Sequence, residues 1–151
     1  MKRTPMPRRR TPLSRYGSRI RAVSAKRAAR RGEYDHLRAL VHAREGGCCA
    51  RCGTPQPITV GTIHHRRKQG QGGPDTPANC VWTCYPCNGG WIEDNPAEAI
   101  ALGWTVPNGA VPEAWPVWRR HHGRWGWWQP SETGWTEATP DSRQHAPEEA
   151  A

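Results

Sequence analysis

Residues 49–52 read Cys-Ala-Arg-Cys, and residues 84–87 read Cys-Tyr-Pro-Cys. Each pair has the spacing that lets two thiolates point at one ion from a tight turn, and two such pairs supply the four sulfurs of a tetrahedral zinc site. The segment between the pairs, residues 53–83, is longer than in a usual zinc ribbon, which indicates an insert. The sequence therefore predicts a structural Zn²⁺ bound by Cys49, Cys52, Cys84 and Cys87.

A disulfide framework is the alternative for these cysteines. The N-terminus is charged, but no apolar stretch follows it as in a secretory signal, and a reducing cytosol favours free thiols. We therefore expect a cytoplasmic protein with metal-bound thiolates. Two cysteines are left over: Cys48 could replace Cys49 only by changing the spacing, so it is assigned no role, and Cys80 is expected to be a small buried apolar side chain.

The composition limits how the chain can fold. Its 151 residues include nine Trp and six Cys but no Phe, and Val, Ile and Leu are scarce, so a large aliphatic core is excluded. Metal binding to thiolates can contribute roughly 10 kcal/mol or more of folding free energy, which would compensate for the thin core. No apolar run approaches the ~18 residues that span a bilayer, which argues against a membrane protein.

The net charge of +9 is unevenly distributed. Residues 1–31 carry twelve Lys and Arg and no acid, whereas residues 32–151 carry ten basic and thirteen acidic groups. A basic segment interrupted by prolines favours contact with nucleic acid, because each cation that meets a phosphate releases counterions. The alternative is a solvated extension that aids solubility. In either case we expect residues 1–31 to be a largely disordered arm.

Periodicity and turn residues predict the remaining elements. Apolar residues recur at helical spacing between Glu33 and Glu45, and two glycines end this helix. The other expected elements are a short basic helix within 18–31, a strand through Ile58, Val60 and Ile63, a loop over 69–77, a helix in the later part of 88–102 with Pro96 in its first turn, and a hairpin of 124–129 with 134–137.

The insert between the cysteine pairs carries a second set of polar residues. Residues 64–68 read His-His-Arg-Arg-Lys, Asn79 precedes the second cysteine pair, and Asn88 directly follows it. The ordered set of Cys-x-x-Cys, His-His, Asn and Cys-x-x-Cys-Asn resembles the HNH endonuclease family over about residues 41–101. The wider chain looks like the short HNH proteins of actinobacterial phages.

This resemblance implies a small, zinc-stabilised α+β fold whose core is a ββα-metal finger, with one catalytic divalent cation between hairpin and helix. His64 would occupy the first cation-ligand position, His65 the general-base position, Asn79 the position that ties the connecting loop and orients the base, and Asn88 the last ligand position. Many members have a His at that last position, but this chain has none between His65 and His121. An amide oxygen is a fair ligand for Mg²⁺ or Mn²⁺, with Zn²⁺ or Ni²⁺ as alternatives.

The residue types suit phosphodiester hydrolysis. A neutral imidazole can take a proton from water, and a divalent cation can neutralise the phosphate and the leaving oxygen. Adjacent histidines on a strand point to opposite faces, so both reach one phosphate only if the strand bends or bulges there. Arg66, Arg67 and Lys68 are expected to bind phosphate, with a solvated turn as the alternative. Without a catalytic role, His64 and His65 would be a surface pair, Asn79 a turn residue, and Asn88 a turn residue or helix cap.

The last third of the chain is rich in Trp, Pro and Gly. Its tryptophans could stack on bases, but we expect them to form the core of a small hairpin packed on the finger. The predicted organisation is a basic arm at 1–31, an HNH nuclease domain with its zinc site at 32–102, a Trp-rich hairpin extension at 103–138 and a loose tail at 139–151.

These features predict a metal-dependent DNA endonuclease. Its expected partner is DNA, and the resemblance to phage proteins adds a role beside a terminase in genome packaging. One alternative is a non-catalytic zinc module that binds nucleic acid through the arm, and another is an adaptor whose Trp-rich segment docks a partner. The His-His, Asn and Asn set favours the enzyme, because a pure binding module does not need it.

Overall fold

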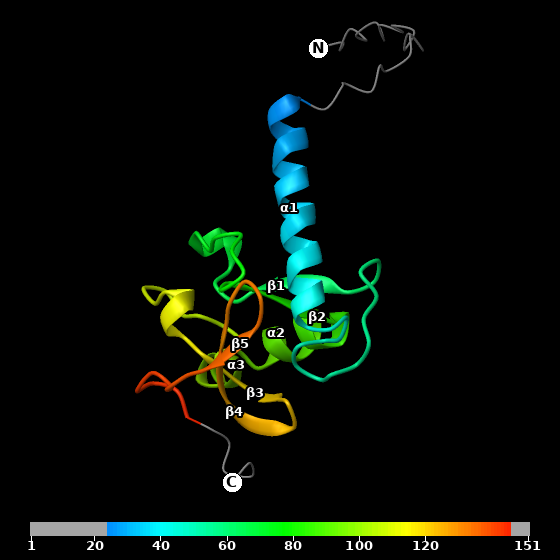
Figure 1. Cartoon of the computed structure of the whole chain (residues 1–151). Coiled ribbons are helices and arrows are strands. Elements are labelled where there is room, and N and C mark those ends of the chain that lie inside the picture. The colour runs from blue at the N-terminus through cyan, green and yellow to red at the C-terminus, as the bar shows by residue number, and fades with distance from the viewer. Residues whose placement is uncertain (1–23, 146–151) are drawn as a thin grey trace, which may run out of the picture.

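The computed structural model describes residues 24–145, which form helices and antiparallel strands (Figure 1). Helix α1 spans Ala25–Arg44 and begins at Ser24, whose hydroxyl oxygen accepts a hydrogen bond from the Arg27 N–H at 3.3 Å. This contact satisfies a donor that the first helical turn would otherwise leave unpaired. The helix is continuous through residue 31, where the sequence placed the end of a largely disordered arm.

The two halves of α1 have different surroundings. Its buried residues are Leu37 and Val41, both in the second half. The first half projects from the rest of the molecule (Figure 1), so its basic side chains face solvent. The helix ends at two glycines, Gly46 with a φ of 61° and Gly47 with a φ of 70°, a conformation that glycine adopts without strain.

A two-stranded antiparallel sheet lies against α1. Strand β1 (Thr62–His65) pairs with β2 (Cys80–Thr83) in a regular register without a bulge. Because side chains alternate along a strand, one face of this sheet packs against α1. The buried cluster there consists of Leu37, Val41, Ile63, Cys80 and Trp82.

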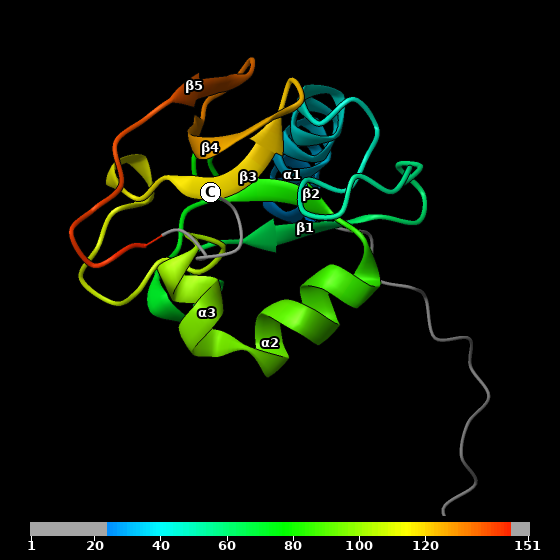
Figure 2. The ribbon, with the colours of Figure 1, turned by 90° about the horizontal axis from the view of Figure 1, so that it is seen from below.

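Short helical segments follow β2 and cover the other face of the sheet (Figure 2). These segments are η2 (Pro86–Trp91), a π-helical stretch, α2 (Ile92–Asp94) and α3 (Pro96–Ala101). Val81 of β2 belongs to the same core cluster as Ile92 of α2 and Ala99 of α3. The sequence correctly placed Pro96 in the first turn of a helix.

A second sheet closes the core from the C-terminal side. Its strands are β3 (Val117–His121), β4 (Arg124–Pro130) and β5 (Trp135–Glu137), paired antiparallel in that order. The predicted hairpin is confirmed as β4–β5, and β3 adds a strand that the sequence did not predict. As expected, tryptophans replace aliphatic residues in this core, among them Trp104, Trp128 and Trp135.

The remaining chain forms loops with two short 3₁₀ turns, η1 (Gln69–Gln71) and η3 (Pro112–Ala114). The predicted strand through Ile58 and Val60 is wrong, because the N–H groups of Val60 and Gly61 both turn back to the Pro57 carbonyl and leave the two apolar side chains exposed.

The C-terminal tail also differs from the prediction, as far as it is described. Gln144 is buried, and its amide donates to the Pro116 carbonyl at 2.7 Å. The expectations for residues 1–23 and 146–151 lie outside the described residues. Within residues 24–145, no helix is both long and apolar enough to cross a membrane.

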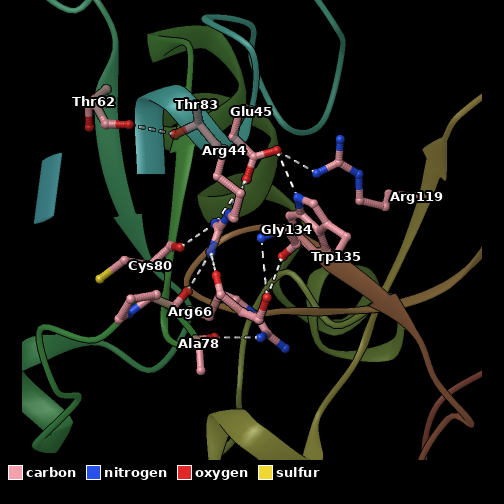
Figure 3. Close-up of polar contacts among 12 residues, drawn as sticks. Arg44, Glu45, Thr62, Arg66, Ala78, Cys80, Thr83, Arg119, Gly134 and Trp135 are labelled. Atoms are coloured by element: carbon pink, nitrogen blue, oxygen red, sulfur yellow. Dashed lines mark hydrogen bonds and ion pairs between the residues drawn. The ribbon is translucent and has the colours of Figure 1, made fainter. Parts of the chain in front are cut away.

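A buried ionic network holds the end of α1 against the second sheet (Figure 3). The Glu45 carboxylate lies 2.9 Å from Arg44 and 2.7 Å from Arg119, and it accepts a hydrogen bond from the Trp135 indole at 3.1 Å. Its side chain is 1% exposed. Arg44 also donates to the carbonyls of Pro77, Cys80 and Ser131, which joins three segments distant in sequence.

We predict that Glu45→Ala lowers the free energy of unfolding by about 3–5 kcal/mol, because it leaves buried arginines without their counter-charge. Urea denaturation measures the change. The matched control is Glu137→Ala, which removes an exposed carboxylate that pairs with Arg124 at 3.1 Å and should cost less than about 1 kcal/mol. Equal effects of the two substitutions would contradict the role given to Glu45.

Candidate functional site

Four cysteines converge at the junction between α1, β2 and η2. Cys49 and Cys52 lie in the turn after α1, Cys84 follows β2, and Cys87 lies in η2. Their sulfurs all lie within 4.8 Å of one another, and those of Cys52 and Cys84 are 3.8 Å apart. A tetrahedral zinc with Zn–S bonds of about 2.3 Å needs sulfurs about 3.8 Å apart. The predicted metal-ligand set is therefore confirmed as a cluster arranged to bind a metal ion.

The local backbone explains why the two cysteine pairs meet. The Ala50 N–H donates to the Trp82 carbonyl at 2.8 Å, which attaches the first turn to β2. Gly53 has a φ of 74° and closes this turn by donating its N–H to the Cys49 carbonyl at 2.9 Å. Burial raises the pKa of Cys49, so its thiol is neutral until a cation displaces the proton.

The two other cysteines lie outside this cluster. Cys80 is fully buried, as expected, and burial raises its pKa to about 12. Cys48 is half-buried, and its sulfur lies 3.6 Å from the Gly46 carbonyl.

The side chain of His64, in β1, faces the side chain of Asn88, in η2. His64 Nδ1 lies 2.8 Å from Asn88 Oδ1, and His64 Nε2 lies 2.7 Å from the Trp104 carbonyl. Both facing atoms are oxygens that only accept, and a neutral imidazole has one N–H to donate. Burial lowers the pKa of His64 and favours the neutral ring, so one of its two nitrogens faces an oxygen with a lone pair.

The orientation of the Asn88 amide follows from its other contact. Thr62 Oγ1 donates to the Ile63 carbonyl at 3.1 Å, so it accepts from Asn88 Nδ2 at 3.0 Å. Asn88 Oδ1 consequently points at His64 Nδ1, and in the tautomer protonated on Nε2 both of these atoms carry lone pairs. Such a pair of donor atoms could hold a cation.

His65 has a partner that the sequence did not predict. Its Nε2 lies 2.7 Å from the Asp75 carboxylate, and the Gln69 amide donates to the same carboxylate oxygen at 3.1 Å. Burial raises the pKa of Asp75, but the hydrogen bonds from His65 and Gln69 outweigh it and hold that pKa below its ordinary value. Asp75 lies in the loop that was identified by its Gly and Pro content, and only the spacing of an acid ten residues after a histidine could have drawn attention to it.

Asn79 fastens the loop that contains Asp75. Its Oδ1 accepts from the Arg67 N–H at 2.7 Å, and its Nδ2 donates to the carbonyls of Arg67 and Pro74 at 3.1 and 2.9 Å. The side chain is fully buried, so these contacts satisfy it completely. Asn79 thus connects the two ends of the loop between β1 and β2.

The structure rules out a phosphate contact for one residue of the basic run after His65. Arg66 is fully buried, and its guanidinium donates to the carbonyls of Gly103 and Ala78 at 3.1 and 2.9 Å. Burial lowers its pKa to about 9. A buried guanidinium cannot meet a phosphate, so the expectation for Arg66 is wrong. Lys68 is exposed but pairs with Glu93 at 2.6 Å, and Arg67 is half-buried.

The histidine pair is divided between the two sides of β1. The register of β1 is regular, so His64 faces η2 and His65 faces the loop that carries Asp75. The structure therefore brings His64 together with Asn88, and His65 together with Asp75, but it gives His65 and Asn88 no direct contact.

We predict about one tightly bound zinc per chain, measured by elemental analysis after exhaustive dialysis. Cys84→Ser should lose this zinc and the cooperative unfolding transition, because one ligand is removed and the remaining buried thiols lose their cation. Cys48→Ser is the control and should keep both. Full zinc content in Cys84→Ser would contradict the ligand assignment.

Comparisons with known proteins bear on the same part of the chain. The family model described as HNH endonuclease matches residues 49–90, from the first cysteine of the cluster to just beyond Asn88. No curated protein and no solved structure matches the chain. The matched segment contains both cysteine pairs, the histidine pair and both asparagines. Residues 49–90 of this chain are therefore similar to HNH endonuclease domains.

Proposed function

We propose that the protein hydrolyses phosphodiester bonds in DNA, with His65 as the general base and a divalent cation held by His64 and Asn88. The observation that carries this proposal is the pairing of each histidine with a suitable partner inside the segment that matches the HNH family: His64 with Asn88, and His65 with Asp75.

The contacts of His64 support the cation site. A metal-ligating histidine normally donates its other ring N–H to a carbonyl, as His64 does to Trp104 in the tautomer protonated on Nε2. Two ligands of a small octahedral cation at about 2.1 Å lie about 3 Å apart, close to the separation of His64 Nδ1 and Asn88 Oδ1. A bound divalent cation would neutralise charge on the phosphate and on the leaving oxygen.

The contacts of His65 support its role as the base. A carboxylate only accepts, so His65 donates from Nε2 to Asp75, and Nδ1 is the nitrogen left to take a proton from water. Gln69 and Asn79 hold Asp75 and its loop in place. Because β1 is regular, His65 and the cation ligands lie on opposite sides of the strand, so one scissile phosphate reaches both only when β1 bends as DNA binds.

Charge on α1 supports DNA as the substrate. Lys26, Arg27, Arg30 and Arg31 are exposed on its projecting half, and the charge of Arg30 contributes to the lowered pKa of Asp75. The basic half of α1 thus lies on the side of the molecule that carries the His65–Asp75 pair. Its cations can replace the counterions of a DNA backbone bound there. A role in phage packaging beside a terminase is the finer prediction, and it rests on the resemblance of the sequence alone.

One observation favours a second candidate, a nucleic-acid-binding module without catalysis. His64 is 4% exposed and both of its ring nitrogens have partners, as in a structural histidine. Cleavage assays separate the two candidates.

We predict that the wild-type protein nicks supercoiled plasmid with Mg²⁺ or Mn²⁺, and that His65→Ala slows nicking by about 10²–10⁴-fold. Agarose gels measure the rate. The absence of nicking with every divalent ion tried would favour the binding module, and an unchanged rate for His65→Ala would remove His65 from the mechanism.

Asp75 provides a finer test. Asp75→Ala should lower kcat by about ten-fold or more with little change in KM, because it removes a charge-assisted hydrogen bond from the base and not a contact with DNA. Asp75→Asn keeps an accepting oxygen, so its kcat should lie between those of the wild type and Asp75→Ala. A change in KM alone would assign Asp75 to DNA binding instead.

The contribution of α1 is measurable through salt dependence. Replacing Lys26, Arg27 and Arg30 by Gln should weaken binding of a DNA duplex and reduce the slope of log K against log salt by about 0.9 for each phosphate that is no longer neutralised. Arg143→Gln is the control, since this exposed arginine is already paired with Asp141. An unchanged slope in the triple variant would place DNA binding elsewhere.

A further inference from the structure

A polar cavity lies away from the histidines, between the turn that carries the first cysteine pair and the β3–β4 hairpin. Its volume is about 410 Å³, within the usual range of ligand pockets. Figure 2 shows the hairpin next to the loop that follows α1. The side chains that matter for its chemistry are Arg51, Arg119, Arg120 and Trp125.

The cavity is lined by three arginines and one carboxylate, and on its other side by Cys49 and Cys52 of the metal cluster. Its single carboxylate, Glu45, is already engaged by Arg44 and Arg119. Across the described part of the chain, neither Arg51 nor Arg120 has a carboxylate within ion-pair distance. Arg51 Nη1 lies 3.9 Å from the Cys87 sulfur of the metal cluster, so its charge already faces that cluster, whereas Arg120 faces no acidic group. Arg51 lies over the Trp91 ring, with its guanidinium carbon 3.5 Å from the ring centroid, which holds it at the cavity wall.

The hairpin adds an aromatic surface beside these arginines. Trp125 is 54% exposed, which is unusual for so large an apolar side chain. Its ring stacks on Trp118 with 6.2 Å between centroids and 15° between planes, so the indole is held from one side. Arg120 is directly opposite Trp125 in the β3–β4 register, and both side chains therefore leave the same face of the hairpin.

We propose that this surface binds an unpaired segment of nucleic acid, with a base stacked on Trp125 and the adjoining phosphate on Arg120. An aromatic ring beside an arginine without an acidic partner suits single strands, because every base has a π-face and every nucleotide a negative charge. A protein partner of ordinary surface composition could pack on the Trp125 indole but would not supply the negative charge that complements the arginine beside it. The proposal rests on the proposed function only in taking nucleic acid as the ligand. It does not require that His65 catalyses cleavage.

The test uses the full chain with His65→Ala in every variant, so that the probe is not cut. Fluorescence anisotropy measures its affinity for a fluorescein-labelled oligothymidylate of twelve nucleotides. Trp125→Ala should weaken binding about ten-fold, and Trp125→Phe should keep most of the affinity because it can still stack. Arg120→Gln should weaken binding and reduce the salt slope by about 0.7.

Controls separate a binding effect from loss of structure. Arg143→Gln, outside the cavity, should bind as well as the parent, and thermal unfolding should show that Trp125→Ala stays folded. Unchanged affinity in both Trp125→Ala and Arg120→Gln would overturn the proposal. Equal losses in Trp125→Phe and Trp125→Ala would overturn the stacking argument.

Failure of this proposal is distinguishable from failure of the proposed nuclease. Plasmid nicking is measured separately with His65 intact. Weakened oligothymidylate binding without any nicking would keep the surface and remove the enzyme. Normal nicking with unaffected oligothymidylate binding would keep the enzyme and remove the surface.

Discussion

The clustering of four cysteine sulfurs within 4.8 Å of one another is the constraint on which the rest of the structure depends. It joins the turn after α1 to the start of η2, two segments with few aliphatic side chains between them. Asn88 directly follows Cys87, so the cluster also sets where the amide meets His64. A cation at these sulfurs would offset the cost of ordering a chain that lacks Phe and has few Leu. Scaffold and candidate active site are therefore one unit.

Buried charge and tryptophan replace much of the missing aliphatic core. Glu45 is held between Arg44 and Arg119, and both arginines lie over the Trp135 ring, at 5.1 and 4.1 Å from its centroid. Arg66 donates from Nε and Nη1 to backbone carbonyls, while its buried Nη2 has no partner among the described residues. Such groups stabilise only while every partner is present, which makes the packing specific but sensitive to single substitutions.

Local spacing made the cysteine ligands, the α3 start and the β4–β5 hairpin predictable, because each depends on residues close in sequence. Long-range contacts decided the features that were missed. Arg66 is buried by segments 12 to 46 residues away, which no charge pattern reveals. Asp75 becomes a partner of His65 only because Asn79 closes the loop between the strands. The roles of the histidines and asparagines stay predictions.

One zinc ion with an all-sulfur shell is expected to organise the whole domain. X-ray absorption at the zinc edge of the purified protein tests this most directly. We predict four sulfur ligands at about 2.3 Å and no lighter atom in the first shell. A shell with nitrogen or oxygen ligands, or with fewer than four sulfurs, would contradict it.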